Sequence, residues 1–122
     1  MTTRNVAWLH PFSGIAGDMT LGALLDAGAE LSFVISTLEG LNVGGWSLTT
    51  EQVDRNGIRA TRAVVDTPEQ HHHRRWSDIR LLLEQGSLPG RVQARALAVF
   101  EALAVAEGEV HGLPPDEVHF HE

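Results

Sequence analysis

The dipeptide Asn56-Gly57 constrains the fold more than any other feature of the sequence, because it separates two strand-like runs. The first run, residues 46–53, alternates apolar and polar side chains, and residues 58–65 supply a returning strand with Arg59 and Arg62 on its polar face. A two-residue hairpin turn requires positive φ angles, which Asn and Gly adopt more readily than other residues. The sequence therefore predicts an antiparallel hairpin.

Apolar residues at helical spacing predict helices on both sides of this hairpin. Before it, residues 5–10 form a short apolar run that predicts a buried strand. Asp18 is expected to cap a helix that stops at Gly28, and Ser32 to cap a shorter helix over residues 32–38. The N-terminal strand is expected to join the hairpin in a small mixed or antiparallel sheet.

After the hairpin, Ser77 is expected to cap one helix, and Pro89 to open the longest helix, which Gly112 ends. Apolar residues that recur at alternating steps of three and four predict the inner face of this long helix: Val92, Ala96, Val99, Leu103, Ala106 and Val110. The order of elements predicts an α+β fold in which about four to five helices cover a small sheet. An apolar fraction of 43% is enough for one domain over residues 1–122.

The composition excludes several kinds of site and partner. The 122 residues include no cysteine, so any transition metal must be held by imidazole and carboxylate groups rather than by thiolates. A formal net charge of -7 argues against binding to nucleic acid. No apolar stretch reaches the roughly 20 residues of a membrane-spanning helix, and the first residues lack the pattern of a secretion signal. A cytoplasmic protein without a membrane partner is therefore expected.

Histidine is unevenly distributed, because five of the seven histidines lie in two short segments. In the second segment, His119 and His121 flank Phe120, and alternate residues of a strand point to the same side. The two imidazoles are therefore candidates to bind one metal ion, with Glu122 as a further ligand. The alternative is that both histidines lie on the surface beside a buried Phe120.

The first histidine segment is the run His71, His72 and His73, which lies on a predicted loop. Neutral imidazoles on a loop suit the capture and transfer of nickel, zinc or cobalt better than a rigid structural site. The alternative is a solvated polar loop. His111 is either a further ligand or a residue that the helix dipole favours at a helix C-terminus.

The segment from Phe12 to Asp18 joins the predicted first strand to the first helix. Unpaired backbone N–H groups at a helix start can receive an anion, which makes Ser13, Gly14 and Gly17 candidates for cofactor binding, and Asp18 is a candidate to meet a divalent cation. The segment lacks the lysine of the nucleotide-binding P-loop and the third glycine of the dinucleotide fingerprint. A plain tight turn is therefore the alternative.

Three segments, taken in order, resemble the LarC family of nickel insertion proteins. They are residues 12–19 (FSGIAGDM), the histidine run after an Asn-Gly-Ile hairpin, and residues 110–122, which begin Val-His-Gly and end Glu-Val-His-Phe-His-Glu. The resemblance extends over nearly the whole chain. In one respect the sequence departs from the family pattern, because His10 stands where an acidic residue is expected.

This resemblance implies a nickel chelatase, a lyase that inserts Ni²⁺ into pyridinium-3,5-bisthiocarboxylic acid mononucleotide with the assistance of CTP and of Mg²⁺ or Mn²⁺. The product is the nickel-pincer cofactor of lactate racemase. Nickel handling is thereby implied for His71, His72, His73, His119 and His121, catalytic roles for Asp18 and Glu122, and cofactor binding for Ser13, Gly14 and Gly17.

Family members continue beyond the His-Phe-His-Glu segment, so the resemblance implies that residues 1–122 form the N-terminal domain of a longer protein. Its partners are then expected to be the mononucleotide, the C-terminal domain of the same protein and a lactate racemase-type apoenzyme, and a homo-oligomer is left open. Two alternatives stay open as well. One is a metallochaperone or storage domain that binds nickel without catalysis, and the other is a phosphohydrolase that uses Asp18 and the glycine turn.

Overall fold

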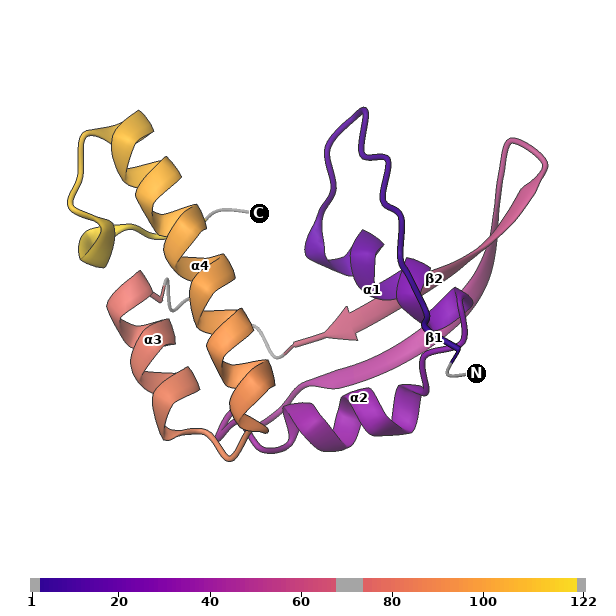
Figure 1. Ribbon diagram of the computed structural model, residues 1–122, viewed down its shortest axis with the longest axis horizontal. Helices are drawn as coiled ribbons and strands as arrows, with labels where there is room; N and C mark the ends of the chain where they lie inside the picture. The colour runs from indigo at the N-terminus through magenta and orange to yellow at the C-terminus, as the bar shows by residue number, and fades with distance from the viewer. Residues whose placement is uncertain (1–2, 68–73, 121–122) are drawn as a thin grey trace. The chain divides into compact units, whose positions relative to one another are not determined.

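The structure of the chain is a computed structural model that describes residues 3–67 and 74–120. These residues contain four α-helices, a two-stranded sheet and one short 3-10 helix (Figure 1). The predicted α+β fold class is confirmed. Among the described residues the chain divides into two compact units: unit 1 comprises residues 3–29 and 49–64, and unit 2 comprises residues 30–48 and 65–120.

Unit 1 consists of the N-terminal segment, helix α1 (Gly17–Asp26) and most of a hairpin formed by strands β1 (Ser47–Arg55) and β2 (Ile58–Asp66). Asn56 and Gly57 have φ angles of 54° and 80°, so the predicted hairpin turn is confirmed. Both edges of this two-stranded sheet lack a further strand among the residues that the structure describes.

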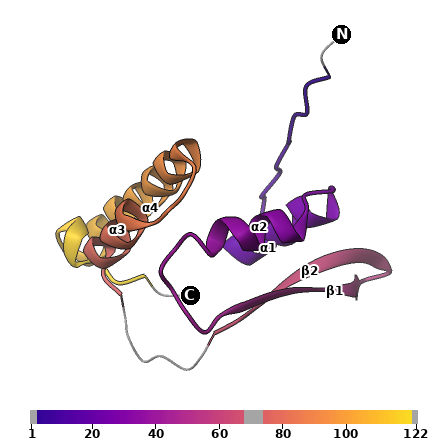
Figure 2. The same cartoon turned by 90° about the horizontal axis from the view of Figure 1, so that it is seen from below.

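Helix α1 packs closely against the backbone of β2, and Figure 2 shows the helix beside the hairpin. The contact is made at Gly22, which is buried. A Cβ atom at this position would lie 2.7 Å from the carbonyl oxygen of Thr61 and 3.3 Å from the backbone nitrogen of Ala63. Only glycine permits this approach, so a single residue fixes the spacing between the helix and the strand.

The expected N-terminal strand at residues 5–10 is wrong, because the structure has neither strand nor helix there. The apolar run remains exposed to solvent: Val6 is 82% exposed and Trp8 is 88% exposed. A strand requires a neighbouring edge for its backbone hydrogen bonds, and within the described residues no strand pairs with this segment. An apolar pattern alone does not supply that partner.

Unit 2 contains helices α2 (Leu31–Leu38), α3 (Trp76–Gln85) and α4 (Gly90–His111), followed by the 3-10 helix η1 (Pro115–Glu117). Its core is centred on Trp76, Leu83 and Ala104, which are at most 4% exposed. The rings of Trp76 and Phe100 are stacked, with centroids 6.1 Å apart and an interplanar angle of 15°. This core joins α3 to α4.

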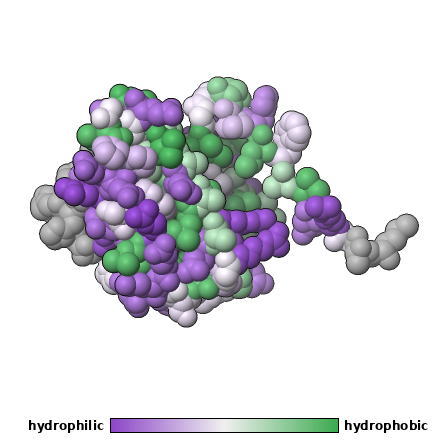
Figure 3. Space-filling view, turned by 60° about the vertical axis from the view of Figure 1, so that its left-hand side comes forward, coloured by the Kyte–Doolittle hydropathy of each residue, from purple (hydrophilic) through white to green (hydrophobic). Residues whose placement is uncertain are grey.

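The predicted inner face of α4 is wrong for five of its six residues, although the helix itself lies where it was expected. Ala104 and Gly108 are buried, and Leu97 and Phe100 pack into the core. Of the predicted series, Ala96 also packs against this core, whereas the other five residues are exposed, for example Val99 at 60%. Figure 3 shows hydrophobic residues at the surface among hydrophilic ones. The helix carries two apolar stripes at helical spacing, and only the packing of α3 decides which one is buried.

The observed N-caps each lie two residues before the expected ones. Helices α1, α2 and α3 have Ala16, Glu30 and Arg75 as N-caps, in place of the predicted Asp18, Ser32 and Ser77. At α3 the free N–H of Arg75 donates to Oδ2 of Asp78 at 3.0 Å, so a carboxylate within the first turn does the capping. In the ranges that the structure describes, no helix is long and apolar enough to cross a membrane.

Candidate functional site

The candidate residues of the Phe12–Asp18 segment lie in unit 1, at the start of α1. The N–H of Gly14 donates to the carbonyl of Pro11 at 3.1 Å, and Gly14 has a φ of 86°, so this segment contains a tight turn. Asp18 lies in the first turn of α1, where its Oδ1 accepts a hydrogen bond from the N–H of Met19 at 2.8 Å. A negative charge is favoured there by the helix dipole.

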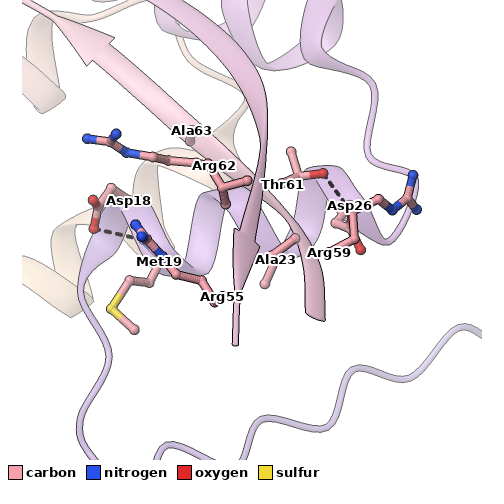
Figure 4. A pocket seen from close by; sticks show the side chains of 11 residues that line it. Asp18, Met19, Ala23, Asp26, Arg55, Arg59, Thr61, Arg62 and Ala63 are labelled. Atoms are coloured by element: carbon pink, nitrogen blue, oxygen red, sulfur yellow. Dashed lines mark hydrogen bonds between the residues drawn. The ribbon is translucent and has the colours of Figure 1, made fainter. Parts of the chain in front are cut away.

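A hollow of about 500 Å³ lies between α1 and the hairpin (Figure 4). We call it the arginine hollow, because Arg55, Arg59 and Arg62 line it from the hairpin. Helix α1 contributes two acidic residues, Asp18 and Asp26, and two apolar residues. The volume falls within the range of small-molecule sites, which is about 300–1,000 Å³.

The arginine hollow is lined by charged groups of both signs, three arginines and two aspartates. Arg62 forms an exposed salt bridge with Glu51 at 2.9 Å. By contrast, within residues 3–67 and 74–120 no carboxylate forms a salt bridge with Arg55 or Arg59. Two guanidinium groups therefore remain available, and guanidinium groups bind phosphate and carboxylate through paired N–H donors.

The two aspartates of the hollow already accept hydrogen bonds of their own. Oδ1 of Asp26 accepts a hydrogen bond from the hydroxyl of Thr61 at 2.6 Å, which links the end of α1 to β2. Asp18 accepts the bond from Met19 described above. Sequence reasoning did not single out this hollow. The available signal was the presence of three arginines within residues 55–62, but the hollow itself lies between the hairpin and α1, which packs against β2 at Gly22.

A second hollow of unit 1, of about 300 Å³, lies beside the Phe12–Asp18 segment and is called here the N-terminal hollow. Residues 9–15 line it, so it includes Ser13 and Gly14, whereas Gly17 lines neither hollow. Met19 and Ala23 of α1 line both hollows. The N-terminal hollow, with a largely apolar lining, and the charged arginine hollow are therefore neighbours along one helix.

In unit 2, His111 and His119 line one hollow of about 260 Å³, together with Leu113 and Val118. We call it the histidine hollow. The two histidines are brought together because Gly112, with a φ of 66°, ends α4 and reverses the chain. From the sequence, His111 was expected to be either a further metal ligand or a residue that the helix dipole favours at a helix C-terminus. The structure places it at the end of α4 and in the same hollow as His119.

Two further contacts fix this arrangement. Val118 is 2% exposed and so anchors the segment that carries His119. The Nε2 atom of His111 lies 3.2 Å from Oε2 of Glu107, one helical turn earlier. A carboxylate is therefore close to one imidazole of the histidine hollow.

His119 also forms an antiparallel β-bridge with Arg75. Next to it, the N–H of Trp76 donates to the carbonyl of Val118 at 2.9 Å. The predicted extended conformation around residue 119 is thus present. Arg75 follows the histidine run by two positions in the sequence.

The remaining predicted ligands, namely His71, His72, His73, His121 and Glu122, lie outside the described residues. Among the residues that are described, no group of three or more His, Asp or Glu side chains is arranged to hold a metal ion. The predicted convergence of the two histidine segments on one ion therefore stays a prediction.

Comparison with known proteins identifies the family. A relative from Roseiflexus castenholzii is 47% identical over 117 residues, which cover 96% of this chain and 30% of the relative. Relatives from Nocardioides sp. and Staphylococcus saprophyticus are 43% and 39% identical, over 100% and 97% of this chain and 30% of each relative. Both are named pyridinium-3,5-bisthiocarboxylic acid mononucleotide nickel insertion protein.

The chain thus spans about three tenths of the length of these relatives. No solved structure matches it. The model of the family described as nickel insertion protein matches residues 7–122, which is nearly the whole chain. The resemblance noted in the sequence is therefore confirmed, and the chain belongs to the nickel insertion protein family.

Proposed function

We propose that this chain is the N-terminal domain of a protein that inserts Ni²⁺ into pyridinium-3,5-bisthiocarboxylic acid mononucleotide. The names of the relatives support this substrate. The structural observation that carries the proposal is the histidine hollow, where His111 and His119 supply two imidazoles to one space. Imidazole is a ligand suited to nickel, and a sequence without cysteine offers no thiolate in its place.

The bridge between Arg75 and His119 supports a role for both histidine segments. The histidine run ends two residues before Arg75, and His121 follows His119 by two residues. The backbone pairing thus connects the parts of the chain that carry the two segments. We propose that His71, His72, His73 and His121 join His119 in capturing nickel and passing it on.

Insertion forms bonds from nickel to sulfur and to a ring carbon of the mononucleotide. A nickel–carbon bond replaces a carbon–hydrogen bond, so a base has to accept the proton that is released. Asp18 and Glu122 are the carboxylates proposed for this role. Ser13, Gly14 and Gly17 are proposed to bind the mononucleotide beside α1.

The activity of the full-length protein is part of the same proposal. It includes assistance by CTP with Mg²⁺ or Mn²⁺, a C-terminal domain, and delivery of the nickel-pincer cofactor to a lactate racemase-type apoenzyme in the cytoplasm. A second candidate function rests on the same two imidazoles of the histidine hollow. In that case residues 1–122 bind nickel as a metallochaperone or storage domain and do not catalyse insertion.

Calorimetric titration of the 122-residue chain with NiCl₂ tests the nickel site. The double variant His111→Ala/His119→Ala is expected to bind nickel at least about tenfold more weakly, since even residues that only orient ligands contribute that much. The matched control is His10→Ala, which removes an exposed imidazole of unit 1 and is expected to bind as the wild type does. Wild-type affinity in the double variant would rule out a site in the histidine hollow.

The two candidate functions are separated by a metallation assay on the mononucleotide. If residues 1–122 belong to a chelatase, insertion by a full-length relative requires CTP and falls when the residues equivalent to His111 and His119 are replaced. A storage domain would bind nickel equally well and leave the rate of insertion unchanged.

A further inference from the structure

We propose that residues 5–9 are a docking segment, which pairs as a β-strand with an extended segment of the same polypeptide beyond residue 122. The identity of the partner rests on the proposed function, which makes residues 1–122 the N-terminal domain of a longer protein. The need for a partner rests on the backbone and the side chains of the docking segment itself.

The backbone of the docking segment has no hydrogen bond within the part of the chain that the structure describes. The first backbone bond after it is the one that the N–H of Phe12 donates to the carbonyl of His10 at 3.0 Å. Figure 2 shows the trace that leads from the N-terminus towards α1 as elongated. Five consecutive residues without proline thus present a row of open N–H and C=O groups, which is a template for pairing with another strand.

The side chains of the docking segment are apolar in both directions. Alternate residues of an extended chain point to opposite sides, so Val6 and Trp8 face one way and Ala7 and Leu9 face the other. Trp8 is 88% exposed and Leu9 is 53% exposed. A run that is apolar on both faces is typical of a strand covered on both sides, and aromatic residues are enriched where proteins meet. The side chains therefore call for a partner as the backbone does.

The hairpin of unit 1 does not supply this partner. Among the described residues β1 and β2 pair only with each other. The outward side chains of β1 include Thr49, Thr50 and Glu51, which are polar and exposed, so the hairpin offers little apolar surface to Trp8. The partner strand has to come from elsewhere.

The length of the relatives indicates where the partner comes from. The chain spans 30% of the relatives from Roseiflexus castenholzii and Nocardioides sp., so most of each relative lies outside the matched segment. A strand from the same polypeptide pairs intramolecularly, at an effective concentration that a separate molecule in dilute solution does not reach. This favours the rest of the polypeptide over a second copy of the chain.

The docking segment leads directly into residues that are proposed to bind the mononucleotide. Its last residue, Leu9, lines the N-terminal hollow together with Phe12, Ser13 and Gly14. Phe12 is 88% exposed. Pairing at residues 5–9 leaves this turn in place and brings a further part of the protein to the border of the hollow. The docking segment thus connects the two parts of the protein next to the proposed mononucleotide site.

Hydrogen–deuterium exchange tests the pairing in the 122-residue chain and in the full-length Nocardioides relative, which matches all of this chain. In the 122-residue chain the amides of residues 5–9 are expected to exchange nearly as fast as in an unfolded peptide. At the aligned positions of the relative they should exchange at least about 100-fold more slowly, because paired amides exchange only when the structure opens. The internal control is residues 97–104 of α4, which should be protected in both proteins. Unprotected amides in the relative would overturn the proposal.

Proline substitutions test the backbone directly. Ala7→Pro and Trp8→Pro each remove one N–H, and neither N–H makes a hydrogen bond in this chain, so both variants should keep the urea midpoint of the 122-residue chain. Alternate amides face a partner strand, so at least one of the two aligned substitutions in the relative should speed exchange of the neighbouring amides at least about tenfold. The matched control is Thr3→Pro, which lies outside the docking segment. No effect of either substitution in the relative would contradict the pairing.

Two further readings separate this proposal from its alternatives. Exchange of residues 5–9 that slows as the concentration of the 122-residue chain rises would identify a second copy as the partner and overturn pairing within one polypeptide. Nickel insertion by the relative without protection of the aligned residues would refute the docking segment alone. Protection in a relative that does not bind nickel would refute the proposed function and leave the docking segment standing. Protection together with nickel insertion supports both.

Discussion

Arg75 and His119 pair across an antiparallel bridge, although 44 positions separate them (119 − 75). The hydrogen bond from Trp76 to Val118 reinforces the pairing from its core side. Because Trp76 and Val118 are at most 3% exposed, the bridge is attached directly to the core of unit 2. A rigid attachment of this kind gives His119, which is proposed as a metal ligand, a fixed position that a solvated loop does not provide.

The spacing of α1 and β2 depends on Gly22. Gly22→Ala is expected to destabilise unit 1 by about 1–3 kcal/mol, because the added Cβ meets the backbone oxygen of Thr61, which cannot rotate away. Urea unfolding checks this value. The control is Gly90→Ala, where a Cβ meets nothing within 4 Å, and which should not lower stability. Equal effects of the two substitutions would contradict the close contact.

The hairpin turn depends on a positive φ at Gly57. Gly57→Ala is expected to cost about 1–2 kcal/mol, because a side chain is strained at a φ of 80° even in open space. Gly44→Ala is the matched control, since Gly44 also has open space and no positive φ. Thermal unfolding followed by circular dichroism measures both. No difference between the two would mean that the turn adopts another conformation.

The buried face of α4 can be tested with two alanines on opposite stripes. Ala104 is 0% exposed, so Ala104→Leu overpacks the core of unit 2 and is expected to cost about 1–3 kcal/mol. Ala106→Leu places the same side chain on the exposed stripe and should change the free energy of unfolding by less than about 0.5 kcal/mol. A larger cost for Ala106→Leu than for Ala104→Leu would support the buried face that was predicted from the sequence.

Arg80 makes two contacts in unit 2, one with Asp116 and one with the ring of Trp76. Arg80 forms a salt bridge with Asp116 at 3.0 Å, and its guanidinium carbon lies 5.8 Å from the centroid of the Trp76 ring. Asp116→Asn should therefore cost less than about 1 kcal/mol, because the pair is exposed. Arg80→Ala should cost more, since it also removes the cation–π contact. Urea unfolding of both variants measures the two costs. Equal losses of unfolding free energy in Asp116→Asn and Arg80→Ala would show that the ring contact contributes nothing.

The residues of the candidate sites were only partly predictable. His119 and Asp18 were named from their motifs, and His111 was named with two alternatives. Arg55 and Arg59 received no role, because arginines on a hairpin usually form a solvated polar face. Their shared hollow depends on the position of α1, and that position follows from a contact between Gly22 and backbone 39 residues later (61 − 22). A local pattern contains no information about such a contact.

The sequence by itself determined the elements whose causes are local. The Asn56-Gly57 turn, the end of α4 at Gly112 and the α+β class follow from φ preferences and from apolar spacing, and family membership follows from ordered motifs. Tertiary structure alone decided that residues 5–10 form no strand, which stripe of α4 is buried, and that His111 and His119 share a hollow. The physical reason is that burial and hydrogen bonding require a partner surface, and the residues that provide it lie far away along the chain.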